Sequence, residues 1–266
     1  GLNYGIDFRG GTNIQIRFKE VPNLDQLRDF FADKDLGNVM LQTFGSVEDR
    51  EILLGLSVDN PLGTGEKLTY GLRQMLQTDY PELELRRIET IGPKVGDELK
   101  TSALQAIMIA LGLVLVYITF RFQWRQGIAA IITLLHDVMV VVGIFSIFDK
   151  EFTLPVIAAL LTVVGYSLND TIVIFDRIRE NISKFRQRKL LPLINQSVTE
   201  TLSRTLLTSG TTMLVVLALF FLGGEIIHDF AFALLIGVLI GTYSSIYVAS
   251  PVVLWLTKIA PPKSSN

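Results

Sequence analysis

The chain has 266 residues, of which 49% are hydrophobic, and its formal net charge is −2. This apolar composition argues against an ordinary soluble domain and favours a membrane protein. A net charge close to zero argues against electrostatic binding of nucleic acid. The sequence has no cysteine, which excludes disulfides, thiolate catalysis and zinc sites built from thiolates.

The first 98 residues are polar and carry the patterns of a small mixed domain. Alternating apolar residues predict strands, and stretches with one apolar face predict amphipathic helices. This βαββαβ order is typical of an α+β ferredoxin-like domain, which we expect over residues 1–98. The pattern predicts strands at 12–18, 38–44, 50–58 and 83–91, and helices at 23–34 and 66–79.

Beyond residue 98 the sequence becomes strongly apolar. A helix needs roughly 20 residues to cross about 30 Å of hydrocarbon, and helices of soluble proteins seldom stay apolar all round for that length. We therefore expect an α-helical polytopic membrane protein with a transmembrane domain at 99–258 and a tail at 259–266. The expected spans lie near 99–120, 127–148, 153–176, 201–222 and 230–257.

The connections between the spans predict the orientation. Arg121 and Arg125 follow the first span, a strongly basic stretch at 177–189 follows the third, and Lys258 and Lys263 lie near the end of the chain. Basic connections remain in the cytoplasm. An odd number of spans then places residues 1–98 on the opposite side, which is the periplasm in a bacterium.

Two charged residues lie inside predicted spans. Asp170 interrupts the third span and Arg204 interrupts the fourth, and an antiparallel hairpin places the two at similar depth. A lone charge there costs about 2.5–3.5 kcal/mol on insertion scales. An Asp–Arg pair lowers this cost, and protonation of the carboxylate breaks the pair, so the two residues are candidates for a proton relay. The alternative is a static pair that fixes the order of the helices.

Polar side chains extend from both charges along the helices. Glycines at positions 165 and 210 are expected to let the two helices approach closely. Helical spacing predicts one shared face in each span, with Thr162, Tyr166 and Asn169 beside Asp170, and Thr208, Thr211 and Thr212 beside Arg204.

The second span contains His136 and Asp137 near its middle. They could extend a proton path, bond a neighbouring helix or face another subunit. A metal-dependent phosphohydrolase is rejected because no further ligand cluster accompanies the His-Asp dipeptide. We therefore expect no metal and no cofactor. Protons are the expected coupling ion, and Na⁺ remains an alternative because Asn169, Asp170, Thr162 and Thr208 could offer oxygen ligands.

Several motifs together resemble one known family. They are GIDFRGG (5–11), ETIGPKVGDEL (89–99), LLHD (134–137), GYSLNDTIVIFDRIREN (165–181), SRTLLTSGTT (203–212) and the stretch from GGE (223–225) to GTYSSIYVASP (241–251). The chain resembles the SecD/SecF family of bacterial protein-export membrane proteins over nearly its whole length. It is similar, more distantly, to the resistance–nodulation–division (RND) superfamily of proton-driven transporters.

The resemblance implies a function that spacing alone does not give. It implies a non-enzymatic inner-membrane protein that pairs with SecD, as a separate chain or fused to it, and acts beside the SecYEG channel. The pair is expected to use the proton-motive force to draw unfolded preproteins out on the periplasmic side, after the SecA ATPase has driven their entry. Asp170 and Arg204 match the relay residues of the family, with Asn169 and Asp137 as further candidates, and membrane lipids surround the spans.

Members of the family usually have six spans, the first of which precedes the GIDFRGG motif. A sixth span is therefore expected upstream of residue 1. Two alternative functions remain: an RND-type exporter of small molecules or lipids, and a scaffold that holds SecD at the channel without carrying ions. An exporter needs a large outer domain with a substrate cleft, and the 98 residues of the first domain argue against one.

Overall fold

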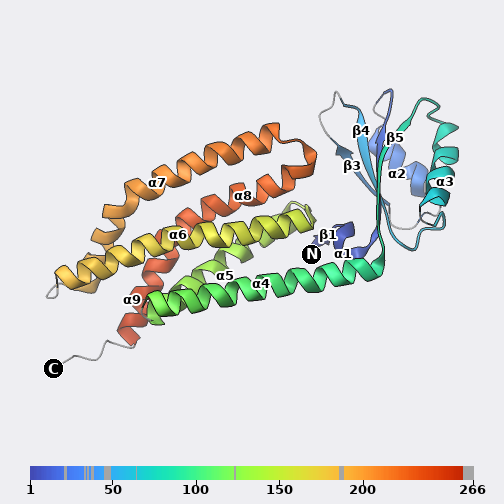
Figure 1. Cartoon of the computed structure of the whole chain (residues 1–266). Coiled ribbons are helices and arrows are strands. Elements are labelled where there is room, and N and C mark those ends of the chain that lie inside the picture. The colour runs from blue at the N-terminus through green and yellow to red at the C-terminus, as the bar shows by residue number, and fades with distance from the viewer. Residues whose placement is uncertain are drawn as a thin grey trace. The chain divides into compact units, whose positions relative to one another are not determined.

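The computed structural model describes residues 1–20, 23–32, 34, 36, 39–44, 49–63, 65–122, 124–185 and 189–259. The chain forms two compact units (Figure 1). The smaller unit holds residues 3–104 and 151–154, and the larger unit holds residues 1–2, 105–150 and 155–266.

The smaller unit is built on an antiparallel four-stranded sheet with the strand order β3-β4-β2-β5. The predicted βαββαβ order is confirmed, with each element within a few residues of its expected position. The elements are β2 (Gly11–Arg17), α2 (Leu24–Ala32), β3 (Val39–Phe44), β4 (Glu51–Leu56), α3 (Glu66–Gln77) and β5 (Glu84–Ile91).

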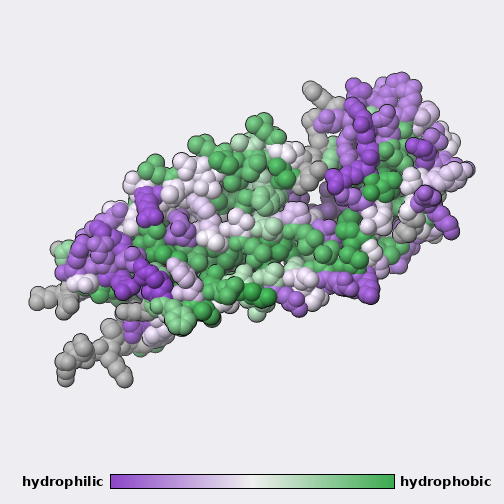
Figure 2. All heavy atoms as spheres, viewed as in Figure 1, coloured by the Kyte–Doolittle hydropathy of each residue, from purple (hydrophilic) through white to green (hydrophobic). Residues whose placement is uncertain are grey.

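The core of this unit lies between the sheet and its two helices. Ile14 and Ile16 of β2 alternate with polar residues, so both point to the same face and are fully buried. Leu27 of α2 and Leu72 of α3 belong to the same core and pack with these isoleucines. The outer surface of the unit is mainly hydrophilic (Figure 2).

The GIDFRGG motif forms a short helix and a tight turn before the sheet. Helix α1 (Ile6–Arg9) ends at Gly10, whose φ of 71° favours glycine, and β2 begins at Gly11. A Cβ atom on Gly11 would lie 2.5 Å from the carbonyl oxygen of Leu56, so a side chain does not fit there.

Two short strands next to this motif were not predicted. Strand β1 (Asn3–Tyr4) pairs in parallel with β6 (Glu151–Phe152). Asp7 Oδ2 accepts a hydrogen bond of 2.9 Å from the backbone N–H of Leu154, the first residue of α6. This carboxylate satisfies one of the N–H groups that a helix start leaves unpaired.

Five helices in the described part of the chain are long and apolar enough to cross a membrane, which confirms the five predicted spans. Several start earlier or end later than predicted because their polar ends continue the same helices. The helices are α4 (Pro93–Arg121), α5 (Trp124–Ile147), α6 (Leu154–Lys184), α7 (Leu190–Leu222) and a fifth helix made of α8 (Glu225–Ser244), the π-helical turn η1 (Ser245–Ala249) and α9 (Ser250–Ile259).

The π-helical turn has a physical cause in the sequence. Pro251 has no backbone N–H, so the regular hydrogen-bond ladder cannot continue through it. Buried serines bond the carbonyls around the turn: Ser245 Oγ donates to Thr242 O (2.9 Å) and Ser250 Oγ to Ser245 O (3.4 Å).

Helices α6 and α8 approach closely at two glycines of α8. A Cβ atom on Gly237 would collide with Val163, and one on Gly241 would lie 3.1 Å from the Cβ of Ser167. The prediction that glycines 165 and 210 create the close approach is wrong for this chain, because a Cβ atom at either position would meet no atom within 4 Å.

Figure 2 shows hydrophobic residues over the middle of the larger unit and hydrophilic ones at the end that carries the α6–α7 connection. There Arg177 contacts Glu180 (2.6 Å) and Glu200 (2.5 Å). The buried Asn181 donates to Ser197 Oγ (2.9 Å) and Glu200 (2.8 Å). These bonds hold the two helices together where they leave the apolar region.

Candidate functional site

Asp170 lies on the inner face of α6 and is 2% exposed. Ser209 Oγ of α7 donates to Asp170 Oδ2 at 3.3 Å. The same hydroxyl accepts hydrogen bonds from Tyr166 Oη (3.1 Å) and from Thr242 Oγ1 of α8 (2.7 Å). Asp170 is therefore the end of a hydroxyl network that joins three helices.

Arg204 does not lie within ion-pair distance of Asp170. None of the ion pairs within 4.0 Å among the described residues joins the two, although they attract each other at longer range. Arg204 is exposed on α7. Its neighbours Thr208 and Thr211 are also exposed, and both hydroxyls donate to carbonyl groups of their own helix.

Helix α7 carries two polar stripes, and the one with Arg204 faces outward. The buried stripe repeats every four residues and contains Ser197, Thr201, Thr205 and Ser209. Thr212 lies between the two stripes and is half-buried. Both stripes are rich in hydroxyl groups, so their composition does not reveal which one faces the other helices.

The remaining residues predicted on α6 are likewise divided between the inner and the outer face of the helix. Tyr166 is half-buried and belongs to the Asp170 network. Asn169 and Thr162 are exposed, and Thr162 Oγ1 donates to Ala158 O at 2.8 Å. The oxygen atoms expected as Na⁺ ligands are therefore split between a buried carboxylate and the outer faces of two helices.

Asp137 forms a second buried site. Its carboxylate is 1% exposed, and Oδ2 accepts hydrogen bonds from Ser167 Oγ of α6 (2.5 Å) and Ser244 Oγ of α8 (2.8 Å). Oδ1 lies 2.9 Å from Nδ1 of His136. Ser167 precedes Asp170 on α6 by about one turn, so α6 contributes to both sites. Helix α8 bonds Asp137 directly through Ser244 and reaches Asp170 through Thr242 and Ser209.

Four hydroxyl residues that complete these networks were missed in the sequence. They are Ser167, Ser209, Thr242 and Ser244, and all lie in apolar spans. Ser167 lies one turn from Asp170 but bonds Asp137, and the other three are on helices that contain neither acid. Serines and threonines are common on all faces of membrane helices, where they bond their own backbone, so a hydroxyl in a span does not identify a partner.

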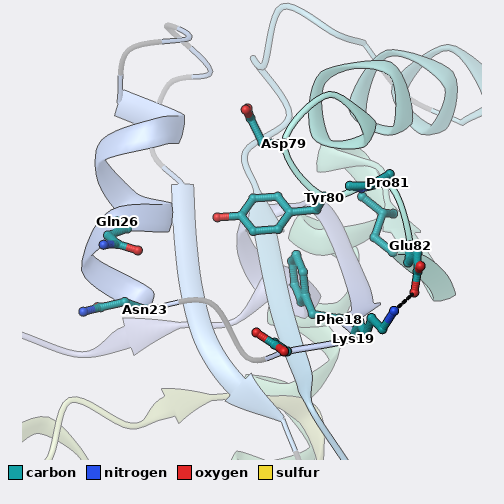
Figure 3. A pocket seen from close by; sticks show the side chains of 10 residues that line it. Phe18, Lys19, Asn23, Gln26, Asp79, Tyr80, Pro81 and Glu82 are labelled. Carbon is teal, nitrogen blue, oxygen red and sulfur yellow. Dashed lines mark ion pairs between the residues drawn. The ribbon is translucent and has the colours of Figure 1, made fainter.

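A separate hollow of about 430 Å³ lies in the smaller unit (Figure 3). Phe18 and Tyr80 form its wall, with their rings edge to face at 5.2 Å. At its rim Lys19 Nζ lies 2.7 Å from Glu82, and this hydrogen-bonded pair raises the pKa of Lys19. Both charged side chains are mostly exposed, so we place the candidate site in the larger unit, where the carboxylates are buried.

Across the described ranges, no group of three or more His, Cys, Asp or Glu side chains is arranged to hold a metal ion. The candidate site contains the titratable side chains of Asp170, Asp137 and His136. Arg204 lies on the outer face of the bundle. Buried carboxylates in an apolar bundle can exchange protons, and their hydrogen-bond partners then rearrange.

Two family profiles match the chain. The profile described as "Protein export membrane protein SecD/SecF, C-terminal" covers residues 72–259, and the profile described as "SecD/SecF GG Motif" covers residues 1–20. Together they include both candidate carboxylates and the GIDFRGG turn.

Similar curated proteins carry the name protein translocase subunit SecF. The relative from Desulfurispirillum indicum is 48% identical over 94% of this chain and 81% of its own length. The relative from Vibrio alginolyticus is 47% identical, over 96% of this chain and 80% of its own length. The relative from Pseudomonas aeruginosa is 40% identical, over 100% and 87% respectively. By these names the relatives are subunits of a protein translocase.

A solved structure has the same fold. The crystal structure of SecDF from Thermus thermophilus, a translocon-associated membrane protein, matches with a TM-score of 0.86 and 40% identity. The match covers 96% of this chain but only 34% of that longer chain. SecDF in its super-membrane-facing form matches with a TM-score of 0.69.

The profile matches, the SecF relatives and the structural match agree with five apolar helices that can cross a membrane. They describe a multi-pass protein of the inner membrane. The chain belongs to the SecD/SecF family of protein-export membrane proteins, in which its relatives are SecF subunits of the translocase.

Proposed function

We propose that the chain is the SecF-type half of a SecD–SecF complex that couples proton movement to late steps of preprotein translocation through SecYEG. In this proposal Asp170 binds and releases the proton, and Arg204 responds to its charge. The unit that contains the four-stranded sheet lies on the periplasmic side, where it acts on the emerging preprotein together with SecD.

The environment of Asp170 supports a change of protonation. The side chain is 2% exposed within a bundle of apolar helices, and its described hydrogen-bond donor is the neutral hydroxyl of Ser209. A buried carboxylate without a contacting cation is most easily stabilised by taking up a proton. A carboxylate whose only role is to fix the helix order is better served by a permanent ion pair, which this chain does not form within 4.0 Å among the described residues.

The outer face of α7 supports a partner inside the membrane. Arg204, Thr208 and Thr211 are exposed on a helix that is long and apolar enough to cross the bilayer. A guanidinium facing hydrocarbon is costly, so intramembrane arginines face protein or water. The related SecDF chain contains a further two thirds of sequence beside the matched part, which is consistent with SecD covering this face.

Proton uptake at Asp170 changes the hydroxyl network that joins α6, α7 and α8. The carboxylate loses its negative charge, so its attraction to Arg204 decreases. It also becomes a weaker acceptor for the hydrogen bond that Ser209 donates. Each charge that crosses the membrane contributes about 2.3 kcal/mol per 100 mV of potential. The helices can therefore repack at the expense of the proton-motive force, and we propose that this repacking moves the periplasmic domain.

Other residues have supporting roles in the proposal. Asn169 lies beside Asp170 on the outer face of α6 and would line the path between the two halves of the complex. Asp137 and His136 form a second polar pair beside the relay, and Tyr166 connects to Asp170 through Ser209. Protons are the proposed coupling ion because Thr162 and Thr208 are exposed on the outer faces of their helices, whereas Asp170 is buried.

Preprotein export tests this proposal. Inverted vesicles that contain SecYEG and SecD together with this subunit are supplied with SecA and ATP, with or without an ionophore that collapses the proton gradient. We expect Asp170→Asn to abolish the part of export that the ionophore removes, and Ser209→Ala to reduce it. If Asp170→Asn exports like the wild type in both conditions, the subunit is a scaffold of the channel.

A further inference from the structure

We propose that His136 is a second proton-binding group of the bundle and that Asp137 is the residue that positions it. The proposal shares one premise with the proposed function, which is that protons enter the bundle. It assigns the proton to His136, whereas the sequence pointed to Asp137 as the further relay candidate.

The carboxylate of Asp137 has three hydrogen-bonding partners. Two hydroxyls, from Ser167 and Ser244, donate to Oδ2 at 2.5 and 2.8 Å. An ionised carboxylate offers only acceptors, and in that form Oδ1 accepts from Nδ1–H of His136 at 2.9 Å. These three contacts fix the position of Asp137 beside His136.

The imidazole of His136 still has one nitrogen to offer. If Nδ1 donates to Asp137, the other ring nitrogen, Nε2, carries the lone pair that accepts a proton. Within the described residues, Nε2 forms no hydrogen bond, and the side chain is 35% exposed, unlike Asp137 at 1%. A proton that binds at Nε2 forms an N–H bond and breaks none, and the product is an imidazolium beside a buried carboxylate.

The helices packed around the pair offer no competing charge at contact distance. The groups that touch it from α6 and α8 are the hydroxyls of Ser167 and Ser244, and η1 contains no charged residue. Asp170 is one turn further along α6 and bonds Ser209 instead. Tyr166 of α6 is half-buried and donates to Ser209. The other described charged or titratable residues on the helices packed against α5 do not bond the pair, and they lie near helix ends or on exposed faces: Lys94, Asp97, Glu98, Lys100, Tyr117 and Arg121 on α4, Asp176, Arg177, Arg179, Glu180 and Lys184 on α6, His228, Asp229 and Tyr243 on α8, Tyr247 on η1, and Lys258 on α9.

This arrangement gives the bundle two places to hold a proton. Ser167 and Asp170 share α6, while Ser244 and Thr242 share α8, so both sites act on the same helix pair. A proton at Nε2 strengthens the bond between His136 and Asp137 within α5 and breaks none of the bonds by which Asp137 joins α5 to α6 and α8. The proposed role of His136 is therefore to hold a proton while the three helices stay joined.

The protonation state of His136 can be measured directly by ¹⁵N NMR. The chain as given has two histidines, at positions 136 and 228, so few signals need to be resolved. The full-length subunit is labelled with ¹⁵N-histidine, combined with unlabelled SecD in lipid vesicles and titrated over the neutral pH range. Subtracting the spectrum of His136→Gln leaves the signal of His136 alone.

We expect the neutral form of His136 to carry its proton on Nδ1 and to convert to the imidazolium as the pH falls. In Asp137→Asn the ratio of protonated to neutral imidazole at a fixed pH should fall about tenfold or more, because the contacting carboxylate is gone. The signal of His228 serves as the control for folding. A wild-type His136 that stays neutral throughout, or an Asp137→Asn variant with an unchanged ratio, overturns the proposal.

Asp170→Asn separates this proposal from the proposed function. We expect this variant to leave the protonation ratio of His136 within about twofold of wild type, because the two carboxylates are not in contact. If His136 titrates normally while Asp170→Asn retains full proton-driven export, only the role of Asp170 is refuted. If His136 never takes up a proton while Asp170→Asn loses export, only the present inference is refuted.

Discussion

The close approach of α6 and α8 gives a prediction with a defined sign. In Gly237→Ala the new methyl group collides with Val163, so the two helices must move apart. Overpacking of this kind typically costs about 1–3 kcal/mol. Alanine is also a better helix former than glycine by about 1 kcal/mol, which offsets part of that loss.

A matched control isolates the contact from the helix propensity. Gly112→Ala makes the same change within α4, at a position where a Cβ atom would meet nothing within 4 Å. The control should gain up to about 1 kcal/mol. The difference between the two variants is then the cost of the collision alone, about 1–3 kcal/mol.

Thermal unfolding of the purified full-length subunit in detergent measures this difference. For a protein of this size about 1 kcal/mol corresponds to 2–4 °C in Tm, so Gly237→Ala should unfold about 2–12 °C below Gly112→Ala. Equal Tm values for the two variants would show that α6 and α8 do not depend on the glycine for their approach, and the reasoning about their packing would be wrong.

Three further changes test other parts of the structure. Glu200→Gln removes the charge that contacts Arg177 of α6, and because the pair is solvent-screened we expect a small drop in Tm that shrinks further in high salt, measured at two salt concentrations. Leu54 is fully buried in the core of the sheet, so Leu54→Ala should lower the free energy of unfolding by about 2–5 kcal/mol, measured by denaturant unfolding of the full chain. Leu53 is half-buried, and Leu53→Ala should lower it clearly less. Equal losses would contradict the orientation of the sheet. Asp7→Ala removes the acceptor for the N–H of Leu154 and should lower the free energy of unfolding by about 0.5–2 kcal/mol. Amide hydrogen exchange should become faster only at the start of α6. Unchanged exchange there would rule out the cap.

The elements of the fold were predictable where the sequence has a clear period. Ile14 and Ile16 alternate with polar residues, and the five apolar stretches exceed the length of a soluble core helix, so the sheet and the spans follow from local pattern. The β1–β6 pair was missed because Asn3 and Glu151 are far apart in sequence and each strand has two residues. No periodic signal exists in so short a strand.

The candidate site was predictable only in part. Asp170 and Asp137 stand out because charged residues in an apolar span are rare, and both are buried. The rotation of each helix about its axis was not predictable, since α7 carries hydroxyls on two faces. Consequently the sequence pointed to Arg204 as the contact of Asp170, whereas the structure places Ser209 there. The glycines at 165 and 237 show the same limit, because only the packing reveals which one touches a neighbour.

Proton flux through the assembled complex tests the central role of Asp170 most directly. Sealed vesicles that contain the subunit with SecD and SecYEG carry a pH-sensitive dye, and the proton flux that accompanies preprotein export is recorded. The matched control is Asp176→Asn, which changes an acid on the same helix that pairs with Arg121 outside the buried networks. We predict that Asp170→Asn abolishes the export-linked flux while the control retains it, with both complexes fully assembled. Equal flux in Asp170→Asn and wild type would contradict the account and leave Asp170 a structural residue of the bundle.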